Sequence, residues 1–240
     1  MNNIGDKVLI IGGGKVGLTA LQYCRENNYA AIVIDENKDC LVRSEADIIE
    51  FENFFKIIQD IKPGQTAFVV MKLNKLISVV NTFVFDYIIP AIPYHLLGKL
   101  TNDFFMNKNI EIHPSIDVIK KIRAKIDPNI IYNYDNLQGI IIASFMPTGI
   151  TCAPNCIEYL KCPITKIEKP KPLYEIFMNA GEGISSYIMI SEQLKPNLGG
   201  FPARSIKDFL DFLYSVKDQF IIGTACMCHG IINAFEIRKE

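Results

Sequence analysis

The sequence predicts an α/β protein in which a mostly parallel sheet is followed by a cysteine-rich α/β part. Over the first 90 residues, short apolar segments alternate with helix-like segments, and this alternation implies crossover connections between parallel strands. A glycine-rich turn comes directly after the first apolar segment. In the second half, five of the 7 cysteines stand in two short segments, a pattern typical of metal binding.

Length and composition limit the classes of function. The 240 residues allow one large domain or two modest ones, enough to bury a real core. The formal net charge of −1 gives no support for nucleic-acid binding, which needs a basic patch. The chain has no apolar run of about 18 residues and no signal-peptide pattern, so we expect a cytoplasmic protein without membrane insertion. Cytosolic thiols stay reduced, and an odd number of cysteines argues against a disulfide framework.

The elements of the first predicted domain, residues 1–115, follow from apolar runs and from breakers. Runs of Ile, Val and Ala predict buried strands, and apolar residues at helical spacing predict helices. The breaker Lys62–Gly64 ends the second helix. The predicted strands cover residues 7–12, 29–35, 46–51, 66–71 and 85–90, and the predicted helices cover residues 16–25, 53–61 and 95–100.

The second predicted domain, residues 116–240, is a cysteine-rich α/β region with a metal or iron–sulfur site. Five prolines between residues 147 and 172 exclude regular structure there. Glycine and proline also mark Ser191–Ser205, which we predict as a loop. The predicted strands cover residues 129–135, 139–145, 185–190, 219–226 and 231–237, and the predicted helices cover residues 116–126 and 206–216.

The glycine-rich turn reads GGGKVG and fits the G-x-G-x-x-G pattern of Rossmann-like nucleotide-binding domains. There the first glycine allows a tight turn, the second lets the backbone approach a pyrophosphate, and the third permits close helix–strand packing. Asp35 ends the next predicted strand, where a carboxylate can bind the ribose hydroxyls of NAD and repel the 2′-phosphate of NADP. Two alternatives to NAD binding remain: the turn binds another adenosine-type nucleotide, or it serves packing alone. The predicted NAD contacts are Gly12, Gly13, Gly14, Lys15, Val16, Gly17 and Asp35.

The stretch Lys7–Asn37 resembles the nucleotide-binding modules of two families. One is the TrkA-N-like regulatory domain of potassium-uptake systems, and the other is the NAD-dependent dehydrogenase of sirohaem synthesis, which carries a similar triple glycine. The resemblance implies a Rossmann fold and cofactor contacts at Gly12, Gly14, Gly17 and Asp35. It covers the part that many Rossmann domains share, so it implies no particular activity.

The cysteines form two groups with uneven spacing. Cys152, Cys156 and Cys162 give C-x3-C-x5-C followed by Pro163, and Cys226 and Cys228 give C-x-C. Three thiols on an irregular loop can converge on one point, and a fourth from the distant pair would complete a tetrahedral set. The uneven spacing and the Cys-Pro step favour a [4Fe–4S] cluster, with zinc as the alternative metal and a redox dithiol or unrelated cysteines as further readings.

Five cysteines compete for four ligand positions. Residues i and i+2 of a strand face one side, so both Cys226 and Cys228 can reach the site, and we slightly favour Cys226 as the fourth ligand. Cys24 and Cys40 lie outside the two groups, and we interpret both as core or incidental residues.

Two histidines are candidate catalytic residues. His229 follows Cys228 and can be a ligand, a proton donor near the metal or a cap in a tight turn. His95 comes just after a predicted strand, at the carboxyl end where doubly wound sheets bind ligands.

Together these features predict an NAD-linked, iron–sulfur-containing oxidoreductase that acts on a small molecule. The first alternative is a non-enzymatic regulator that senses NAD(H) or redox state, like the potassium-uptake regulators. The second is a Rossmann protein stabilised by zinc. The expected partners are a small-molecule substrate or a redox partner protein, and a homodimer is compatible with the sequence.

Overall fold

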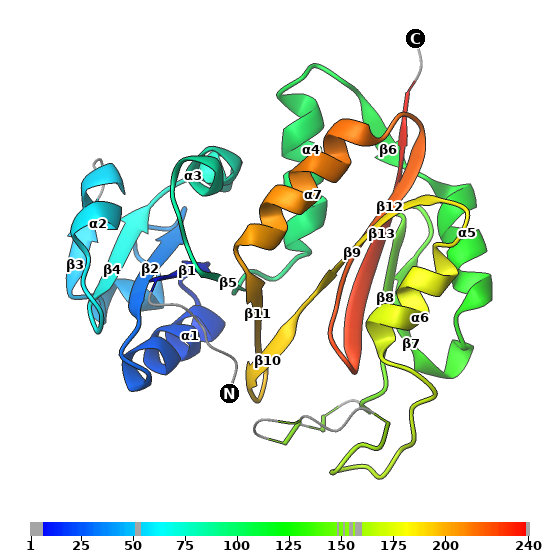
Figure 1. Cartoon of the computed structure of the whole chain (residues 1–240), viewed down its shortest axis with the longest axis horizontal. Helices are drawn as coiled ribbons and strands as arrows, with labels where there is room; N and C mark the ends of the chain where they lie inside the picture. The colour runs from blue at the N-terminus through cyan, green and yellow to red at the C-terminus, as the bar shows by residue number, and fades with distance from the viewer. Residues whose placement is uncertain are drawn as a thin grey trace. The chain divides into compact units, whose positions relative to one another are not determined.

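The protein is a mixed α/β chain with two mixed sheets, which divides into two compact units (Figure 1). The computed structural model describes residues 7–50, 54–147, 149–150, 152–153, 156 and 160–238. The first unit contains the chain up to Leu96 together with Leu198–Asp208, and the second contains Leu97–Asn197 and the chain from Phe209 onward. The division falls after Leu96 and not at the predicted boundary, residue 115, and Ile112–Pro114 pairs with the strand His229–Ile237 of the second unit. The chain later returns to the first unit with a strand and part of a helix.

The first unit is built on parallel strands in the order β5-β1-β2-β4-β3, as the alternating pattern predicted. Its two central strands, β1 (Lys7–Ile11) and β2 (Ala30–Asp35), are buried along almost their whole length. Continuous apolar runs of this kind are typical of parallel strands covered on both faces. The other strands are β3 (Ile48–Glu50), β4 (Thr66–Val70) and β5 (Tyr87–Pro90), and the helical segments are α1 (Lys15–Glu26), η1 (Leu41–Ser44), α2 (Phe54–Asp60), η2 (Leu73–Lys75) and α3 (Leu76–Thr82).

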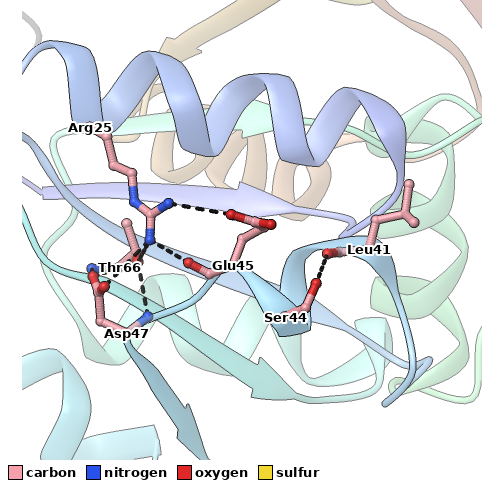
Figure 2. A network of polar contacts seen from close by, with 6 residues as sticks. All are labelled: Arg25, Leu41, Ser44, Glu45, Asp47 and Thr66. Atoms are coloured by element: carbon pink, nitrogen blue, oxygen red, sulfur yellow. Dashed lines mark hydrogen bonds and ion pairs between the residues drawn. The ribbon is translucent and has the colours of Figure 1, made fainter.

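A polar network fixes the amino-terminal ends of these strands (Figure 2). Arg25, in the last turn of α1, donates to the carbonyl of Glu45 and lies 3.4 Å from Asp47 Oδ1 and 3.2 Å from Thr66 Oγ1. Asp47 Oδ2 accepts hydrogen bonds from the Thr66 N–H at 2.8 Å and from its hydroxyl at 2.7 Å. The network joins the end of α1 to the starts of β3 and β4, at the edge opposite the glycine-rich turn.

The second unit has a sheet with strand order β7-β8-β13-β12-β9, and β6 also pairs with β13. Its pairs are antiparallel except β12 with β9, so this sheet is not mostly parallel. The strands are β6 (Ile112–Pro114), β7 (Ile131–Asp135), β8 (Ile140–Ser144), β9 (Ser185–Ile190), β12 (Gln219–Ala225) and β13 (His229–Ile237). The helices are α4 (Leu96–Met106), α5 (Ile116–Lys125), η3 (Pro128–Ile130), α6 (Leu173–Ala180) and α7 (Arg204–Ser215), the last of which begins in the returning segment.

The prediction of a loop over Ser191–Ser205 was wrong. The segment contains the strands β10 (Glu192–Lys195) and β11 (Leu198–Pro202), and β11 pairs antiparallel with β5. The two residues that separate these strands explain the turn, since Pro196 fixes its own φ and Asn197 adopts a φ of 61°. The ends predicted at Phe51 and Asn53 lie outside the described residues. Within the described part of the chain, every helix is too short or too polar to cross a membrane.

Candidate functional site

The glycine-rich turn has the backbone geometry that its sequence predicted. Gly12 follows β1 with a φ of 107°, and a Cβ atom there would lie 2.5 Å from the carbonyl oxygen of Ala91. A Cβ atom on Gly17 would overlap the carbonyl oxygen of Gly12. Both positions therefore require glycine, the first for its conformation and the second for the close approach of α1 to β1.

The second glycine of the motif is open instead of crowded. Gly14 is the N-cap of α1 and has no atom within 4 Å of a Cβ built on it. Gly14, Lys15 and Val16 are exposed, and the first turn of α1 contains no acidic residue. A helix amino terminus with uncapped N–H groups favours an anion such as a pyrophosphate.

Asp35 lies beside the turn, at the carboxyl end of β2. Its Oδ2 accepts a hydrogen bond from the Gly13 N–H at 2.6 Å, and its Oδ1 accepts one from the Asn37 N–H at 2.7 Å. Each carboxylate oxygen has a second lone pair, so both can still accept from a ribose hydroxyl. The carboxylate thus fixes the turn as well as offering the predicted ribose contact.

Cys40 also contacts this turn, which sequence reasoning did not predict. A Cβ atom on Gly13 would overlap Cys40 Sγ, and the Val42 N–H donates to the Gly13 carbonyl at 3.1 Å. Burial, opposed by backbone hydrogen bonds and joined by the charge of Asp35, raises the pKa of the Cys40 thiol. Its position in a polar segment after β2 gave no sign of this contact.

His95 lies in the segment between β5 and α4 and is half-buried. The same segment begins with Ala91 and Ile92, which lie against Gly12. The structure therefore brings the segment of His95 to the carboxyl edge of the sheet, where the glycine-rich turn and Asp35 also stand.

The second candidate site is formed by the cysteines, in the second unit. Cys226 and Cys228 lie in the tight turn between β12 and β13, not within a strand, so the alternation of a strand does not orient them. Cys226 Sγ accepts N–H hydrogen bonds from Cys228 at 3.4 Å and from His229 at 3.3 Å.

The three-cysteine segment follows β8 and lies at the same end of the sheet as this turn (Figure 1). Cys162 and Cys228 belong to one buried apolar cluster, and Cys152 packs against that cluster. Cys162 Sγ accepts from the Thr165 N–H at 3.4 Å and lies 3.6 Å from Met146 Sδ. Members of the two cysteine groups, far apart in the sequence, thus pack in one buried cluster.

The pKa values of the thiols also indicate that the two cysteine groups lie near each other. Burial, together with the charges of Cys228, Cys226, Cys156 and Cys162, raises the pKa of Cys152 to about 11. Burial also raises the pKa of Cys228; the hydrogen bond and the charge of Lys169 oppose this rise, and the charges of Cys226 and Cys156 add to it. Because thiolates placed close together repel one another, a nearby cation favours their ionisation.

Lys169 supplies one such cation. Its Nζ donates to Cys228 Sγ at 3.2 Å, and both residues are buried. Burial opposes ionisation of Cys162, but the hydroxyl and N–H groups of Thr165 and the charge of Lys169 outweigh it and lower the pKa of that thiol. Desolvation and the charge of Lys169 also lower the pKa of His229, whose Nδ1 lies 3.7 Å from Cys226 Sγ. Nothing in the spacing of the sequence marked Lys169.

The donor set suits a thiophilic metal. Five thiols, N–H groups aimed at two of the sulfurs, and an apolar surround are features of zinc and iron–sulfur sites. Among the described residues, no three His, Cys, Asp or Glu side chains already stand at the spacing of a bound ion. Binding would therefore draw the sulfurs inward from their present positions.

Comparison with known proteins places the chain in a family. A family profile described as "Uncharacterized protein, N-terminal domain" matches residues 7–96, and one described as "Uncharacterized protein, C-terminal domain" matches residues 97–238. An "Uncharacterized protein" of Archaeoglobus fulgidus is 25% identical over 228 residues, which is 95% of this chain and 98% of the relative. No solved structure matches the chain significantly. Because the second profile covers more than half of its length, the chain belongs to the AF_1314_C family.

Proposed function

We propose that the protein is an NAD-linked iron–sulfur oxidoreductase that acts on a small molecule. The observation that carries this proposal is the meeting of the two cysteine groups at one end of the second unit's sheet. Cys152, Cys156, Cys162, Cys226 and Cys228 are the candidate ligands of a [4Fe–4S] cluster, which uses four thiolates.

The surroundings of the thiols support a cluster. Cys162 and Cys228 are buried, and Met146 and Met227 pack around them. Backbone N–H groups point at the sulfurs of Cys162 and Cys226. Hydrogen bonds to the sulfurs and a low exposure to solvent are features by which proteins adjust the potential of such clusters.

The first unit supports NAD binding in a Rossmann-like domain. The crowded Gly12 and Gly17, the open Gly14 and the exposed start of α1 together match a pyrophosphate cradle. Asp35 lies beside that cradle with lone pairs for the ribose. His95 belongs to the same edge of the sheet and is the candidate proton donor for a substrate held there.

The two groups would supply different electron chemistry. Nicotinamide exchanges electrons in pairs as hydride, whereas an iron–sulfur cluster exchanges them singly. A cluster held by four thiolates would therefore serve a one-electron partner, whereas one held by only three would leave an iron open to bind a substrate as a Lewis acid. His229 stands beside the candidate ligand Cys226.

Zinc is the second candidate for the thiols, and the hydrogen bonds to their sulfurs are compatible with it. The N–H groups that follow Cys162 and Cys226 in their turns donate to the preceding sulfur, an arrangement that suits a closed tetrahedral zinc site equally well. In that case the protein would be a zinc-stabilised NAD-binding protein, or a regulator that senses NAD(H) without turnover.

Anaerobic purification followed by iron, sulfide and zinc analysis tests the proposal. A brown protein with broad absorption near about 400 nm and iron and sulfide in equal amounts supports a cluster. A protein that contains zinc but no iron supports the second candidate, the zinc site, and not the cluster. A protein that takes up neither metal refutes both. NAD binding is measured separately by calorimetry.

Serine variants of the five cysteines identify the ligands. Substitution of a ligand lowers the metal content, and the fifth, non-ligating cysteine leaves it unchanged. Cys40→Ser is the matched control, because Cys40 lies in the first unit against Gly13 and not among these thiols.

A further inference from the structure

Lys169 joins the two cysteine groups. It follows the three-cysteine segment, and its backbone N–H donates to the carbonyl of Leu160 within that segment. Its side chain reaches across to Cys228 in the turn between β12 and β13. One residue thus holds the segment with its backbone and the turn with its ammonium group.

The position of the ammonium group is unusual for a lysine. Lys169 is 3% exposed, whereas Lys161, Lys166 and Lys171 of the same segment are exposed. A buried ammonium is costly unless an anion or a set of acceptors faces it. One acceptor of the Lys169 ammonium, at 3.2 Å, is the Cys228 sulfur. A thiolate at that position satisfies the ammonium far better than a neutral thiol does.

We propose that Lys169 is a positioning residue that supplies the counter-charge of the thiolate site and hydrogen-bonds its Cys228 sulfur. This inference rests on the proposed function of the thiols as metal ligands. Four thiolates exceed the charge of a zinc ion or an oxidised [4Fe–4S] core by two units, and reduction of a cluster adds one more negative charge. A fixed ammonium beside the sulfurs therefore stabilises the metal-bound form over the metal-free form, and the reduced cluster over the oxidised one.

The contact with Lys169 also favours Cys228 as a metal ligand, in addition to Cys226. A sulfur that receives an ammonium hydrogen bond keeps its negative charge when it also binds metal. Since Cys152, Cys156 and Cys162 come from one irregular segment, the extra, non-ligating thiol would be one of those three. The geometry thus changes the expectation that Cys226 alone provides the fourth ligand.

The test compares Lys169→Met, Lys169→Arg and Lys169→Gln with the wild-type protein. Methionine removes the charge and the donor at similar length, arginine keeps the charge, and glutamine keeps a donor without charge. Lys171→Met is the matched control, because it removes an exposed lysine from the same segment. Two properties are measured: the midpoint potential of the reconstituted cluster, and the dissociation constant for cobalt(II) in competition with a chelator.

For Lys169→Met we expect a more negative potential and a cobalt(II) dissociation constant raised about tenfold or more. Lys169→Arg should stay close to the wild type, Lys169→Gln should fall between them, and Lys171→Met should change neither property. Thermal unfolding of the metal-free proteins shows whether Lys169→Met folds, and Lys169→Gln replaces it in the comparison if it does not.

The outcomes separate this inference from the proposed function. In one outcome, the wild-type protein binds metal, and Lys169→Met and Lys169→Gln change neither the potential nor the affinity. This outcome overturns the role of Lys169 and leaves the proposed function standing. A wild-type protein that binds cobalt(II) but assembles no cluster overturns the iron–sulfur function and still tests Lys169 through the affinity. A wild-type protein that binds neither overturns both.

Discussion

The carboxylate of Asp35 accepts a hydrogen bond from the backbone N–H of Gly13 at 2.6 Å. The acidic residue at the end of β2 therefore helps to hold the glycine-rich turn in place. The same carboxylate also accepts from the Asn37 N–H. If NAD binds as proposed, loss of Asp35 would affect the protein twice, once through the fold of the turn and once through the ribose contact.

Asp35→Asn should weaken NAD binding about tenfold or more, since an amide accepts through only one of its two atoms and loses the charge-assisted hydrogen bonds. The stability should fall by roughly 1–3 kcal/mol, because a backbone N–H loses its acceptor. Calorimetry and chemical denaturation measure the two effects. Asp39→Asn, which alters an exposed ion pair with Arg43, is the control and should affect neither. Unchanged NAD affinity in Asp35→Asn would refute the ribose contact.

Gly14 and Gly17 should respond to alanine in opposite ways. Gly14→Ala meets open space, so the protein should fold normally, and NAD binding should weaken because the new methyl group stands where the pyrophosphate approaches. Gly17→Ala drives a Cβ atom into the Gly12 carbonyl and should cost more than about 2 kcal/mol of stability. Thermal unfolding and NAD titration of both variants distinguish the roles. Equal NAD affinity of Gly14→Ala and the wild type would favour a turn kept for packing.

The sequence was informative where local chemistry decides the structure. Buried parallel strands read as continuous apolar runs, so β1, β2 and β4 could be placed from composition alone. Proline-marked segments were harder, because proline also starts helices and occupies turns. Pro172 is the N-cap of α6, and Pro196 lies in the turn between β10 and β11, so both were predicted as irregular structure.

The candidate sites also differ in how far the sequence predicted them. The glycine pattern predicted the backbone geometry at Gly12 and Gly17, because both glycines meet a local steric demand. The contact of Lys169 with Cys228 joins residues 59 positions apart and depends on how β8, α6 and the β12–β13 turn pack together. Spacing within the sequence carries no trace of such a contact, and the burial of one lysine among several in its segment follows from the fold.

Asp47 should make the stability of the first unit depend on acid pH. Hydrogen bonds from the Thr66 hydroxyl and N–H, with the charge of Arg25, lower the pKa of Asp47 below its ordinary value of 3.8. A carboxylate with a depressed pKa in the folded state stabilises the protein above the ordinary value, and this contribution is lost as the pH falls through the lowered one. Because Asp47 is half-exposed, the contribution should be no more than about 1 kcal/mol.

Asp47→Asn should therefore be less stable than the wild type near neutral pH, and the difference should shrink as the pH falls below about 4. Urea denaturation at a series of pH values measures it. Asp39→Asn again serves as the control, since it removes the same charge from an exposed pair. A stability difference that stays constant into strong acid would show that the Asp47 charge contributes nothing.

Metal binding by the cysteines should become tighter as the pH rises. Burial and the charges of the other four thiols raise the pKa of Cys152 to about 11, so this thiol is protonated at neutral pH and must release its proton to bind. For each proton displaced, the apparent affinity should rise about tenfold per pH unit between roughly pH 6 and pH 9. Cobalt(II) titrations, followed by thiolate-to-metal charge-transfer absorption, measure the slope.

Cys152→Ser tests whether this cysteine contributes to that slope. If Cys152 is a ligand, the variant should bind cobalt(II) more weakly and with a dependence on pH that is shallower by about one proton. Cys40→Ser, whose thiol lies in the first unit, should leave both affinity and slope unchanged. A slope unaltered by Cys152→Ser would identify Cys152 as the extra thiol and leave Cys156 and Cys162 as the ligands from the three-cysteine segment, beside Cys226 and Cys228.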